Sequence, residues 1–385
     1  MEEWREYKLG NVLTIKYGKD HKQIADGDIP IYGSGGIMRY GDRSLYDGPS
    51  ILIPRKGSLN NIMFANNPFW TVDTMFWTII NKDVANPLFV YYSICKKDFA
   101  SLNVGSAVPS LTVPVIEDID ILLPSKETQD RVVAILKSLD DKIEVNRRIN
   151  ENLEQQAQAL FKSWFVDFEP FKNGEFVESE LGMIPKGWRV EALTSFGRIV
   201  CGKTPSKAES SYYGGSIPFI KIPDMHNKVF VEQSEDNLSE TGDNSQPAKR
   251  IPPYSILVSC IATVGLVCIN TIESHTNQQI NTIIPDSPTF RYYLYQKIFS
   301  LKDYLINLGR GGTATLNVNT KIFGNIKIIK PTDELLLEYD KMVSPLFNKI
   351  ETIQKESRHL AQLRDTLLPR LMSGELKVNE IENVL

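Results

Sequence analysis

One segment of this 385-residue sequence matches a nucleotide-binding motif letter for letter. The run Gly197-Arg198-Ile199-Val200-Cys201-Gly202-Lys203-Thr204 has the spacing G-x-x-x-x-G-K-[ST], in which backbone amides and the lysine hold nucleotide phosphates. That chemistry requires a helix that begins at the Gly-Lys-Thr. Pro205 biases Thr204 away from the helical conformation, and residues 198–201 predict a strand. We therefore interpret the match as fortuitous and keep a P-loop nucleotide-binding protein as an alternative.

Other combinations of residues that could do chemistry are incomplete. Ile251-Pro252-Pro253-Tyr254 resembles the tetrapeptide with which amino-methyltransferases hold a flipped base, but isoleucine cannot accept a hydrogen bond from the target amine. The four cysteines form no C-x-x-C pair, and the four histidines do not cluster near them. No carboxylates have the spacing of a nuclease metal site. We therefore expect no catalytic residue, no metal site and no disulfide in this chain.

The sequence contains two related halves. Trp4, Leu9 and Lys16-Tyr17-Gly18-Lys19 return 184 positions later as Trp188, Leu193 and Val200-Cys201-Gly202-Lys203. Residues 119–124 return 207 positions later as residues 326–331, so the second copy has longer loops. Solenoid repeats have units of about 20–50 residues, far shorter than these. The repeat predicts two similar globular modules, each followed by its own helix.

Length and charge limit the classes of function. A chain of this length fits roughly two to three domains. The net charge of −4 argues against a nonspecific nucleic-acid binder with a broad basic surface, so any DNA contact must be local. No run of about eighteen apolar residues and no signal-peptide pattern is present. We expect a cytoplasmic protein that does not bind a membrane.

Each module is expected to be α+β. Short apolar runs between turn residues, such as Ile29 to Tyr32 and Ser50 to Ile53, predict strands. Asn86-Pro87 and the apolar residues that follow predict one short helix. The second module repeats this order, with Ser255 to Val258 as the matching strand and Phe290 to Leu305 as the matching helix.

Apolar residues follow each module with alternating spacings of four and three. This heptad pattern predicts a long helix after each module, with one apolar seam along it. A helix from Glu127 to Phe165 would be about 58 Å long, and such a one-sided apolar stripe requires a partner. We predict that the two helices pair as an intramolecular antiparallel coiled coil. The first seam comprises Val132, Leu136, Leu139, Ile143, Asn146, Asn150, Leu153, Ala157, Leu160 and Trp164, and the second comprises Tyr339, Val343, Leu346, Ile350, Ile353, Ser357, Leu360, Arg364, Leu367 and Leu371.

Two asparagines lie in the middle of the first seam. Asn146 and Asn150 could fix the register of the helix pair at some cost in stability. Alternatively, they face solvent at a bend of the helix.

Five segments of the chain have distinctive sequences: residues 129–144, 159–168, 181–188, 277–281 and 363–376. They closely resemble segments of the specificity subunits of Type I restriction-modification systems. The resemblance covers essentially the whole chain, and the helix motifs are highly specific. The first module departs from it, because Thr71-Val72-Asp73-Thr74 stands where the second module has a polar Asn-Gln-Gln strand. The segments are residues 129–144 and 159–168, similar to the central conserved helix; 181–188, similar to the lead-in to the second target-recognition domain; 277–281, similar to a common strand; and 363–376, similar to the distal conserved helix.

The resemblance implies an α+β fold with two similar α/β target-recognition domains, separated by an antiparallel two-helix coiled coil in a pseudo-two-fold internal repeat. Each domain would read one half of a bipartite site in double-stranded DNA. The coiled coil would set the spacer and dock two methyltransferase subunits. The implied boundaries are 1–125, target-recognition domain 1; 126–168, central helix; 169–187, linker; 188–331, target-recognition domain 2; 332–376, distal helix; and 377–385, C-terminal tail.

The resemblance also implies a non-catalytic subunit that binds no cofactor itself. S-adenosylmethionine, ATP and magnesium would be bound by the methyltransferase subunits and by restriction/translocase subunits. A coiled-coil adaptor that holds two protein-binding modules, with no role on DNA, remains an alternative.

Candidate DNA contacts follow from side-chain type and loop position. Arginine suits guanine, asparagine and glutamine suit adenine, and lysine, serine and threonine mostly contact phosphates. Charged loop residues are often merely solvated, which is the alternative for each of them. The candidates are Lys19, Tyr32, Ser34, Arg39, Arg55, Lys56 and Ser106 in the first module, and Lys203, Thr204, Lys221, Gln278, Gln279, Arg310 and Thr313 in the second.

The helix ends suggest a subunit interface. Their apolar side chains offer more surface than a two-helix seam can cover, which favours a partner. Alternatively, these residues cap the coiled coil against the neighbouring module. They are Phe161, Trp164, Phe165, Leu367, Leu368 and Leu371.

Overall fold

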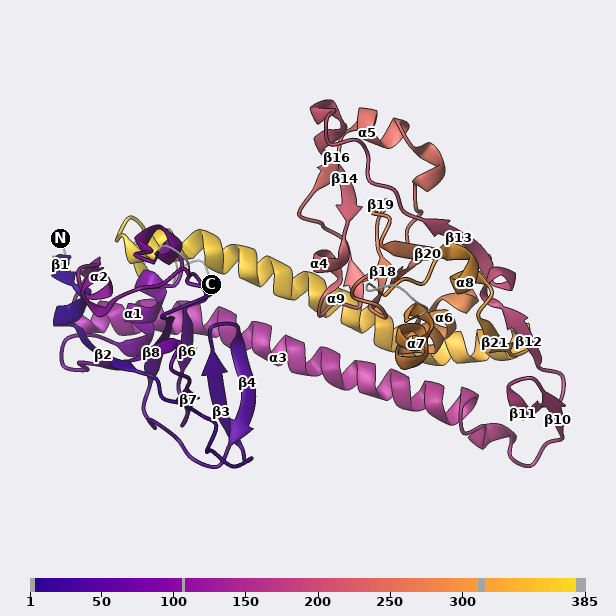
Figure 1. Cartoon of the computed structure of the whole chain (residues 1–385), viewed down its shortest axis with the longest axis horizontal. Coiled ribbons are helices and arrows are strands. Elements are labelled where there is room, and N and C mark those ends of the chain that lie inside the picture. The colour runs from indigo at the N-terminus through magenta and orange to yellow at the C-terminus, as the bar shows by residue number, and fades with distance from the viewer. Residues whose placement is uncertain (1–3, 106–107, 311–315, 379–385) are drawn as a thin grey trace. The chain divides into compact units, whose positions relative to one another are not determined.

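The computed structural model describes residues 4–105, 108–310 and 316–378. The chain falls into two compact units: unit 1 contains residues 1–144 and 358–385, and unit 2 contains residues 145–357. Two 40-residue helices, α3 (Lys126–Phe165) and α9 (Asp333–Met372), each run from one unit into the other (Figure 1). Each unit therefore contains one module and a section of both helices. Among the described residues, none of the helices combines the length and apolar character that crossing a membrane requires.

Module one, in unit 1, is built from short strands and two helices. A four-stranded antiparallel sheet has the order β2 (Leu13–Tyr17), β8 (Met75–Ile80), β5 (Ser50–Pro54), β6 (Met63–Ala65). A three-stranded sheet has the order β4 (Gly36–Gly41), β3 (Ile29–Gly33), β7 (Trp70–Thr71), and β1 (Arg5–Lys8) pairs with β9 (Asp120–Leu123). The helices are α1 (Pro87–Ile94), which begins at the predicted Asn86 cap, and α2 (Val113–Glu117).

Module two, in unit 2, is larger. Its five-stranded sheet has the order β13 (Gly197–Cys201), β20 (Ile280–Pro285), β17 (Ile256–Ser259), β18 (Val267–Asn270), β15 (Phe230–Val231). A three-stranded sheet has the order β16 (Asn237–Leu238), β14 (Tyr213–Ile220), β19 (His275–Thr276), and β12 (Arg189–Ala192) pairs with β21 (Lys327–Lys330). The helices are α4 (Ile222–Met225), α5 (Glu240–Asn244), α6 (Arg291–Ser300), α7 (Lys302–Gly309) and α8 (Thr320–Gly324). The predicted linker contains a hairpin of β10 (Phe176–Ser179) and β11 (Gly182–Pro185).

The strand order confirms the internal repeat. The order β2-β8-β5-β6 in module one corresponds to β13-β20-β17-β18 in module two. The parallel pair β3 and β7 corresponds to the parallel pair β14 and β19, and the pair β1 and β9 to the pair β12 and β21. Strand β16 takes the place of β4, and module two adds α4, β15 and α5 within residues 222–244, which lengthens its sequence.

Each module shares a hydrophobic core with the long helices. In unit 1, Phe76 and Phe89 of module one lie in one buried cluster with Leu136 of α3 and Leu371 of α9. In unit 2, the corresponding cluster joins β-strand and α6 residues of module two to Phe161 and other residues of α3 and α9. The apolar stripes of the helices are thus covered partly by each other and partly by the modules.

Contacts within each unit show that α3 and α9 are antiparallel. In unit 1, Arg364 Nη1 donates to Asp140 Oδ1 at 2.7 Å. In unit 2, the rings of Phe165 and Tyr339 lie 4.8 Å apart. Residue numbers therefore rise along α3 while they fall along its partner α9. All twenty predicted seam positions are buried or half-buried, which confirms the heptad assignment.

The structure decides between the two interpretations of Asn146. Its side chain is fully buried, and Nδ2 lies 2.9 Å from Glu356 Oε2 and 3.2 Å from Ser357 Oγ on α9. The Oδ1 atom is buried and has no hydrogen-bond partner among the described residues. Asn146 is therefore part of the helix interface, where a polar residue favours one register over others.

Replacing Asn146 with leucine should stabilise the helix pair and weaken its register. The substitution removes a buried oxygen without a partner, for which desolvation costs about 1–3 kcal/mol. We expect the melting temperature to rise by roughly 2–4 °C for each kcal/mol gained. Calorimetry of the full chain measures the shift, and disulfide trapping across the seam measures the register. A lower melting temperature would contradict this account, and Asn152→Leu on the exposed face of α3 is the control.

One predicted helix is two helices in the structure. The segment from Phe290 to Leu305 was expected to be continuous, but Leu301 has φ −91° and ψ 10° and separates α6 from α7. The change of direction allows Ile298 and Leu305 to be buried in the same core. No glycine or proline marks this break, so the local sequence gave no signal for it.

Candidate nucleic-acid interface

In module one, the chain that leaves β2 is held against neighbouring segments by its backbone. Gly18 N donates to Met75 O, and Lys19 N donates to Thr71 O, both at 2.9 Å. Position 18 has no room for a side chain, because a Cβ atom there would lie 2.0 Å from Val72 O. The backbone of Lys19 is thereby fixed while its side chain is exposed.

The segment after β5 is bound to the same stretch of chain, residues 71–75, as the segment after β2. Arg55 N and Lys56 N donate to Thr74 O at 2.9 and 3.2 Å. The Arg55 guanidinium lies 5.8 Å from the centre of the Tyr17 ring, and its buried Nε has no hydrogen-bond partner among the described residues. Lys56 is exposed. Arg55 and Lys56 therefore place two cationic side chains beside residues 71–75.

The turn between β3 and β4 packs against that segment. Ser34 O accepts a hydrogen bond from Asn61 Nδ2 at 2.8 Å, and a Cβ atom on Gly57 would lie 2.8 Å from Ser34 Oγ. Tyr32, the residue before Gly33 at the end of β3, is half-buried, and burial raises the pKa of its hydroxyl. The hydroxyl stays protonated at neutral pH and can donate a hydrogen bond. The structure thus brings together five of the predicted residues, the module-one edge: Lys19, Tyr32, Ser34, Arg55 and Lys56.

Module two builds its edge with the same backbone bonds. Lys203 N donates to Thr276 O at 2.9 Å, as Lys19 N does to Thr71 O. The Thr204 hydroxyl donates to Gln278 Oε1 at 2.6 Å, and Gln278 is exposed. Gln279 is half-buried beside it. The module-two edge consists of Lys203, Thr204, Gln278 and Gln279.

The segment that matches the P-loop motif belongs to this edge. Gly197 to Cys201 form β13, and residues 202–206 are not helical. Lys203 therefore lacks the helix N-terminus that a phosphate-binding loop requires. This conformation confirms the predicted strand, and it lacks the geometry of a phosphate-binding loop.

Two predicted contacts are engaged within their modules. Arg39 Nη2 donates to His21 O at 2.6 Å and to Ile24 O at 2.8 Å, so its guanidinium holds the loop before β3. Lys221 forms an ion pair with Asp236, and that hydrogen bond raises the pKa of the Lys221 ammonium group. Contact of these two residues with DNA stays a prediction, and it would require that they exchange these partners for DNA.

The remaining candidates belong to neither edge or lie outside the described residues. Arg310 is exposed at the C-terminal end of α7, where Nη1 lies 3.2 Å from Asn307 Oδ1. It stays a candidate. Ser106 and Thr313 lie outside the described residues.

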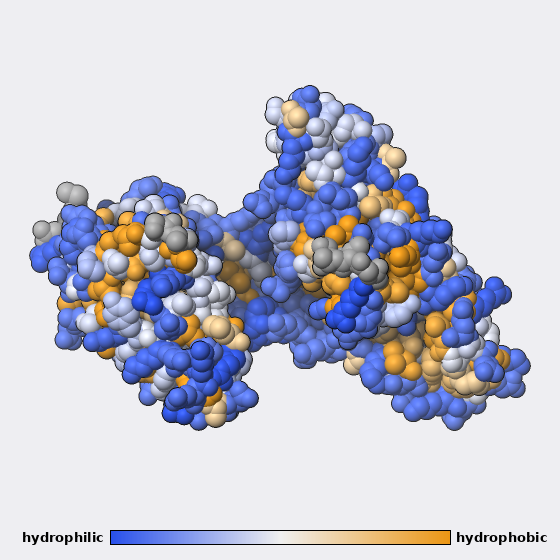
Figure 2. Space-filling model, viewed as in Figure 1, coloured by the Kyte–Doolittle hydropathy of each residue, from blue (hydrophilic) through white to orange (hydrophobic). Residues whose placement is uncertain are grey.

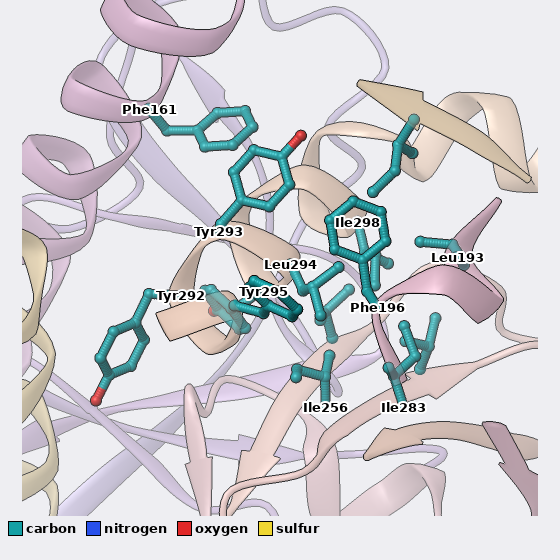
Figure 3. Close-up of a cluster of buried hydrophobic side chains, with 14 of the residues drawn as sticks. Phe161, Leu193, Phe196, Ile256, Ile283, Tyr292, Tyr293, Leu294, Tyr295 and Ile298 are labelled. Atoms are coloured by element: carbon teal, nitrogen blue, oxygen red, sulfur yellow. The ribbon is translucent and has the colours of Figure 1, made fainter. Parts of the chain in front are cut away.

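Most of the apolar residues at the helix ends are covered by the chain itself. Phe161 is 3% exposed and packs on Tyr293 of α6, with ring centres 5.8 Å apart (Figure 3). Phe165 is also 3% exposed, and its ring centre lies 4.9 Å from that of Tyr293. Leu368 and Leu371 are buried in the core of unit 1. This burial favours the second alternative, in which these residues cap the helices against a module. Trp164 and Leu367 are half-buried in the same clusters.

Sequence reasoning missed a buried polar network beside the module-two edge. Asp243 of α5 accepts a hydrogen bond from Arg250 Nε at 2.8 Å and lies 2.7 Å from His275 Nε2. Burial would raise the pKa of the Asp243 carboxyl, but the bonds from Arg250 and His275 outweigh it and hold the pKa below its usual value. Gln246 lies 3.4 Å from His275 Nδ1 and donates to Lys203 O at 3.0 Å. The network therefore supports the edge, and no motif in the sequence marks it.

Comparison with known proteins agrees with this geometry. The family model described as "Type I restriction modification DNA specificity domain" matches residues 1–155 and 185–362. The chain belongs to this family. The two matched segments of the specificity-domain family correspond to the two modules with most of the two long helices, and residues 156–184 between them contain the end of α3 and most of the β10–β11 hairpin.

Two curated members of the family are similar over their whole length. The Type I restriction enzyme HindI specificity subunit of Haemophilus influenzae is 35% identical, over 98% of this chain and 100% of that protein. The MjaIX specificity subunit of Methanocaldococcus jannaschii is 31% identical, over 99% of this chain and 95% of that protein. The crystal structure of a Type I S subunit from M. genitalium shares the fold, with a TM-score of 0.61, 15% identity and 96% coverage of both chains. The predicted family and fold class are thereby confirmed.

Proposed function

We propose that this chain is the DNA sequence-specificity subunit of a Type I restriction-modification system, in which each module reads one half of a bipartite site. The observation that carries the proposal is the duplicated edge. The same backbone bonds hold Lys19 against Thr71 and Lys203 against Thr276, in a chain that belongs to the specificity-domain family. Each edge displays side chains that can contact phosphates and base edges.

The side chains of the two edges differ, which predicts two different half-sites. The module-one edge offers Arg55, Lys56 and a tyrosine hydroxyl, whereas the module-two edge offers Lys203 and two glutamines. Arginine pairs best with guanine and glutamine with adenine. Gln278 and Gln279 therefore favour an A·T pair in the half-site of module two.

The electrostatics fit local contacts rather than a broad basic surface. The net charge is −4, and the visible surface is mostly hydrophilic with apolar patches on the modules (Figure 2). Lys19, Lys56 and Lys203 are exposed at the edges. Binding through a few phosphate contacts should depend on salt less steeply than binding by a basic groove.

We propose that the chemistry belongs to other subunits. Two methyltransferase subunits would dock on the chain, one for each copy of the repeat, and they would supply S-adenosylmethionine. Restriction/translocase subunits would supply ATP and magnesium. The repeat supports two methyltransferase subunits per chain, because each module packs on a similar section of the two helices and so offers a similar docking surface.

Sequencing of modified bases tests the proposed function. Genomic DNA from the source organism is compared with DNA from a strain that lacks this chain. We expect the loss of one methylated motif with two short half-sites around a fixed spacer. If the motifs are identical, and the chain co-purifies with proteins other than a methyltransferase, the coiled-coil adaptor is the correct reading.

Substituting Lys56 with alanine should weaken binding to all DNA sequences alike. Loss of one phosphate contact reduces the slope of log K against log salt by about 1. Titrations of the assembled complex at several salt concentrations measure this slope. Lys82→Ala is the control, because it removes an exposed cation of the same module at the end of β8 opposite Met75 and the module-one edge, and it should leave the slope unchanged. Equal slopes for wild type and Lys56→Ala would exclude Lys56 from the interface.

A further inference from the structure

Strands β3 and β4 form an antiparallel ribbon whose outer strand is apolar and exposed. β4 is the edge strand in the order β4-β3-β7. On it, Ile37, Met38 and Tyr40 are 48%, 59% and 51% exposed, and Met38 is the most exposed large apolar side chain in the described part of the chain. Natural proteins usually protect an edge strand with charge or proline. The one charged residue of β4 is Arg39, whose guanidinium is bound to the loop before β3.

A β-bulge turns two neighbouring apolar side chains outward. Tyr32 pairs with Ile37 and Ile31 pairs with Arg39, so Met38 is the extra residue opposite β3. Neighbouring residues in a regular strand point to opposite faces. Bulges redirect side chains and are common beside functional sites. Here the bulge leaves Ile37 and Met38 exposed together.

The exposed pair lies next to the module-one edge. Met38 packs over Gly33, because a Cβ atom on Gly33 would lie 2.5 Å from Met38 Sδ. The adjoining turn contacts the segment of Lys56 and Gly57 through Ser34. The apolar pair is therefore continuous with side chains that are proposed to contact DNA.

Charge distinguishes the two ends of the ribbon. At the end remote from the turn, Asp28 and Asp42 adjoin the paired residues Ile29 and Gly41, and Arg43 forms an ion pair with Asp42. The cationic residues of the module-one edge lie at the turn. A polyanion would therefore approach the ribbon at the turn, where Ile37 and Met38 are exposed.

We propose, on the basis of the DNA-recognition function above, that the β3–β4 ribbon enters the major groove and that Ile37 and Met38 contact thymine methyl groups. The major groove admits a two-stranded ribbon, and the C5-methyl of thymine is its apolar feature. Isoleucine cannot read the hydrogen-bonding groups of a base, and methionine sulfur is a weak acceptor. These two side chains discriminate thymine from the other bases by apolar contact.

This readout belongs to module one alone. In module two, β14 and β16 take the places of β3 and β4, but Leu238 of β16 is fully buried. Helix α5 follows β16 directly and packs beside β14. Module two therefore has no exposed apolar strand at this place among its described residues.

Replacement of thymine by deoxyuridine removes only the methyl group and tests the inference directly. The assembled complex is titrated with duplexes that carry the motif found by modified-base sequencing, with one thymine at a time replaced. Three proteins are compared: wild type, Met38→Ala, and Met183→Ala, whose methionine is 55% exposed on β11 of the linker hairpin. Thermal melting confirms that all three are folded.

We expect one or two positions of one half-site at which uracil weakens binding by wild type and by Met183→Ala about fourfold, the contribution of one buried carbon group. Met38→Ala should bind thymine and uracil equally at such a position. If wild type is insensitive to uracil at every position while it binds its motif specifically, the inference is wrong and the proposed function stands. If Met38→Ala retains the full uracil effect, the methyl contact belongs to another residue, and the inference is again wrong. Absence of any specific motif would overturn both.

Discussion

Replacing Asp243 with alanine is expected to lower the free energy of unfolding of unit 2 by about 3 kcal/mol. Removal of one partner leaves the other charge of a buried pair uncompensated, which costs about 3–5 kcal/mol. The lower value applies here, since the Arg250 side chain is 34% exposed. The melting temperature should fall by roughly 6–12 °C. The substitution should also loosen the module-two edge, because Gln246, which holds Lys203 O, contacts His275 of the same network.

A second ion pair of module two serves as the matched control. Asp236 pairs with Lys221, and its side chain is 46% exposed. Exposed pairs contribute about 0–1 kcal/mol, so Asp236→Ala should change the melting temperature little. Equal destabilisation by both substitutions would show that burial of Asp243 has no special role.

The lowered pKa of Asp243 gives this effect a pH dependence. A carboxyl whose folded-state pKa is depressed contributes stability above its unfolded value, about 3.9. That contribution is lost as the pH falls through the folded-state pKa. The difference in melting temperature between wild type and Asp243→Ala should therefore be constant near neutrality and shrink below about pH 4.

The long-range architecture was predictable because it repeats in the sequence. Heptads over two 40-residue helices fix which face must be buried, and Asn146 and Ser357 meet at the expected seam positions. The breaks in this architecture were not predictable. The interruption at Leu301 depends on how Ile298 and Leu305 reach one core, which is a property of the packed module rather than of the local sequence.

The candidate site was predictable where the backbone determines it. Lys19 and Lys203 follow Gly18 and Gly202, where a side chain would clash with the backbone. The repeated Gly-Lys pair therefore shows in the sequence where each edge lies. Arg39 and Lys221 have the same residue types and loop positions, yet their charges are satisfied inside the modules. The partner of a long charged side chain is chosen by tertiary structure, and a linear pattern cannot show it. The exposed Met38 was missed for a related reason, since a bulge is set by strand pairing.

Lengthening both long helices by one heptad is expected to abolish methylation of the original motif and to create a motif with a longer spacer. The boundaries between the two units lie within these helices, between Glu144 and Val145 in α3 and between Ser357 and Arg358 in α9. Insertion there leaves the residues that each module contacts unchanged. A duplicate of residues 138–144 in α3 and of residues 358–364 in α9 preserves both seams. It also repeats a complementary pair, because one duplicate carries Asp140 and the other carries Arg364.

The size of the change follows from helix geometry. Seven residues lengthen a helix by about 10.5 Å, which corresponds to roughly three base pairs at 3.4 Å each. Three base pairs also rotate one half-site about the DNA axis by nearly a third of a turn, so activity on the new motif should be lower than that of wild type. Modified-base sequencing of cells that express the variant identifies the motif. The same insertion in α3 alone places the seams out of register, and it should leave neither motif methylated. If the double insertion leaves the spacer unchanged, the helix pair does not determine the distance between the half-sites.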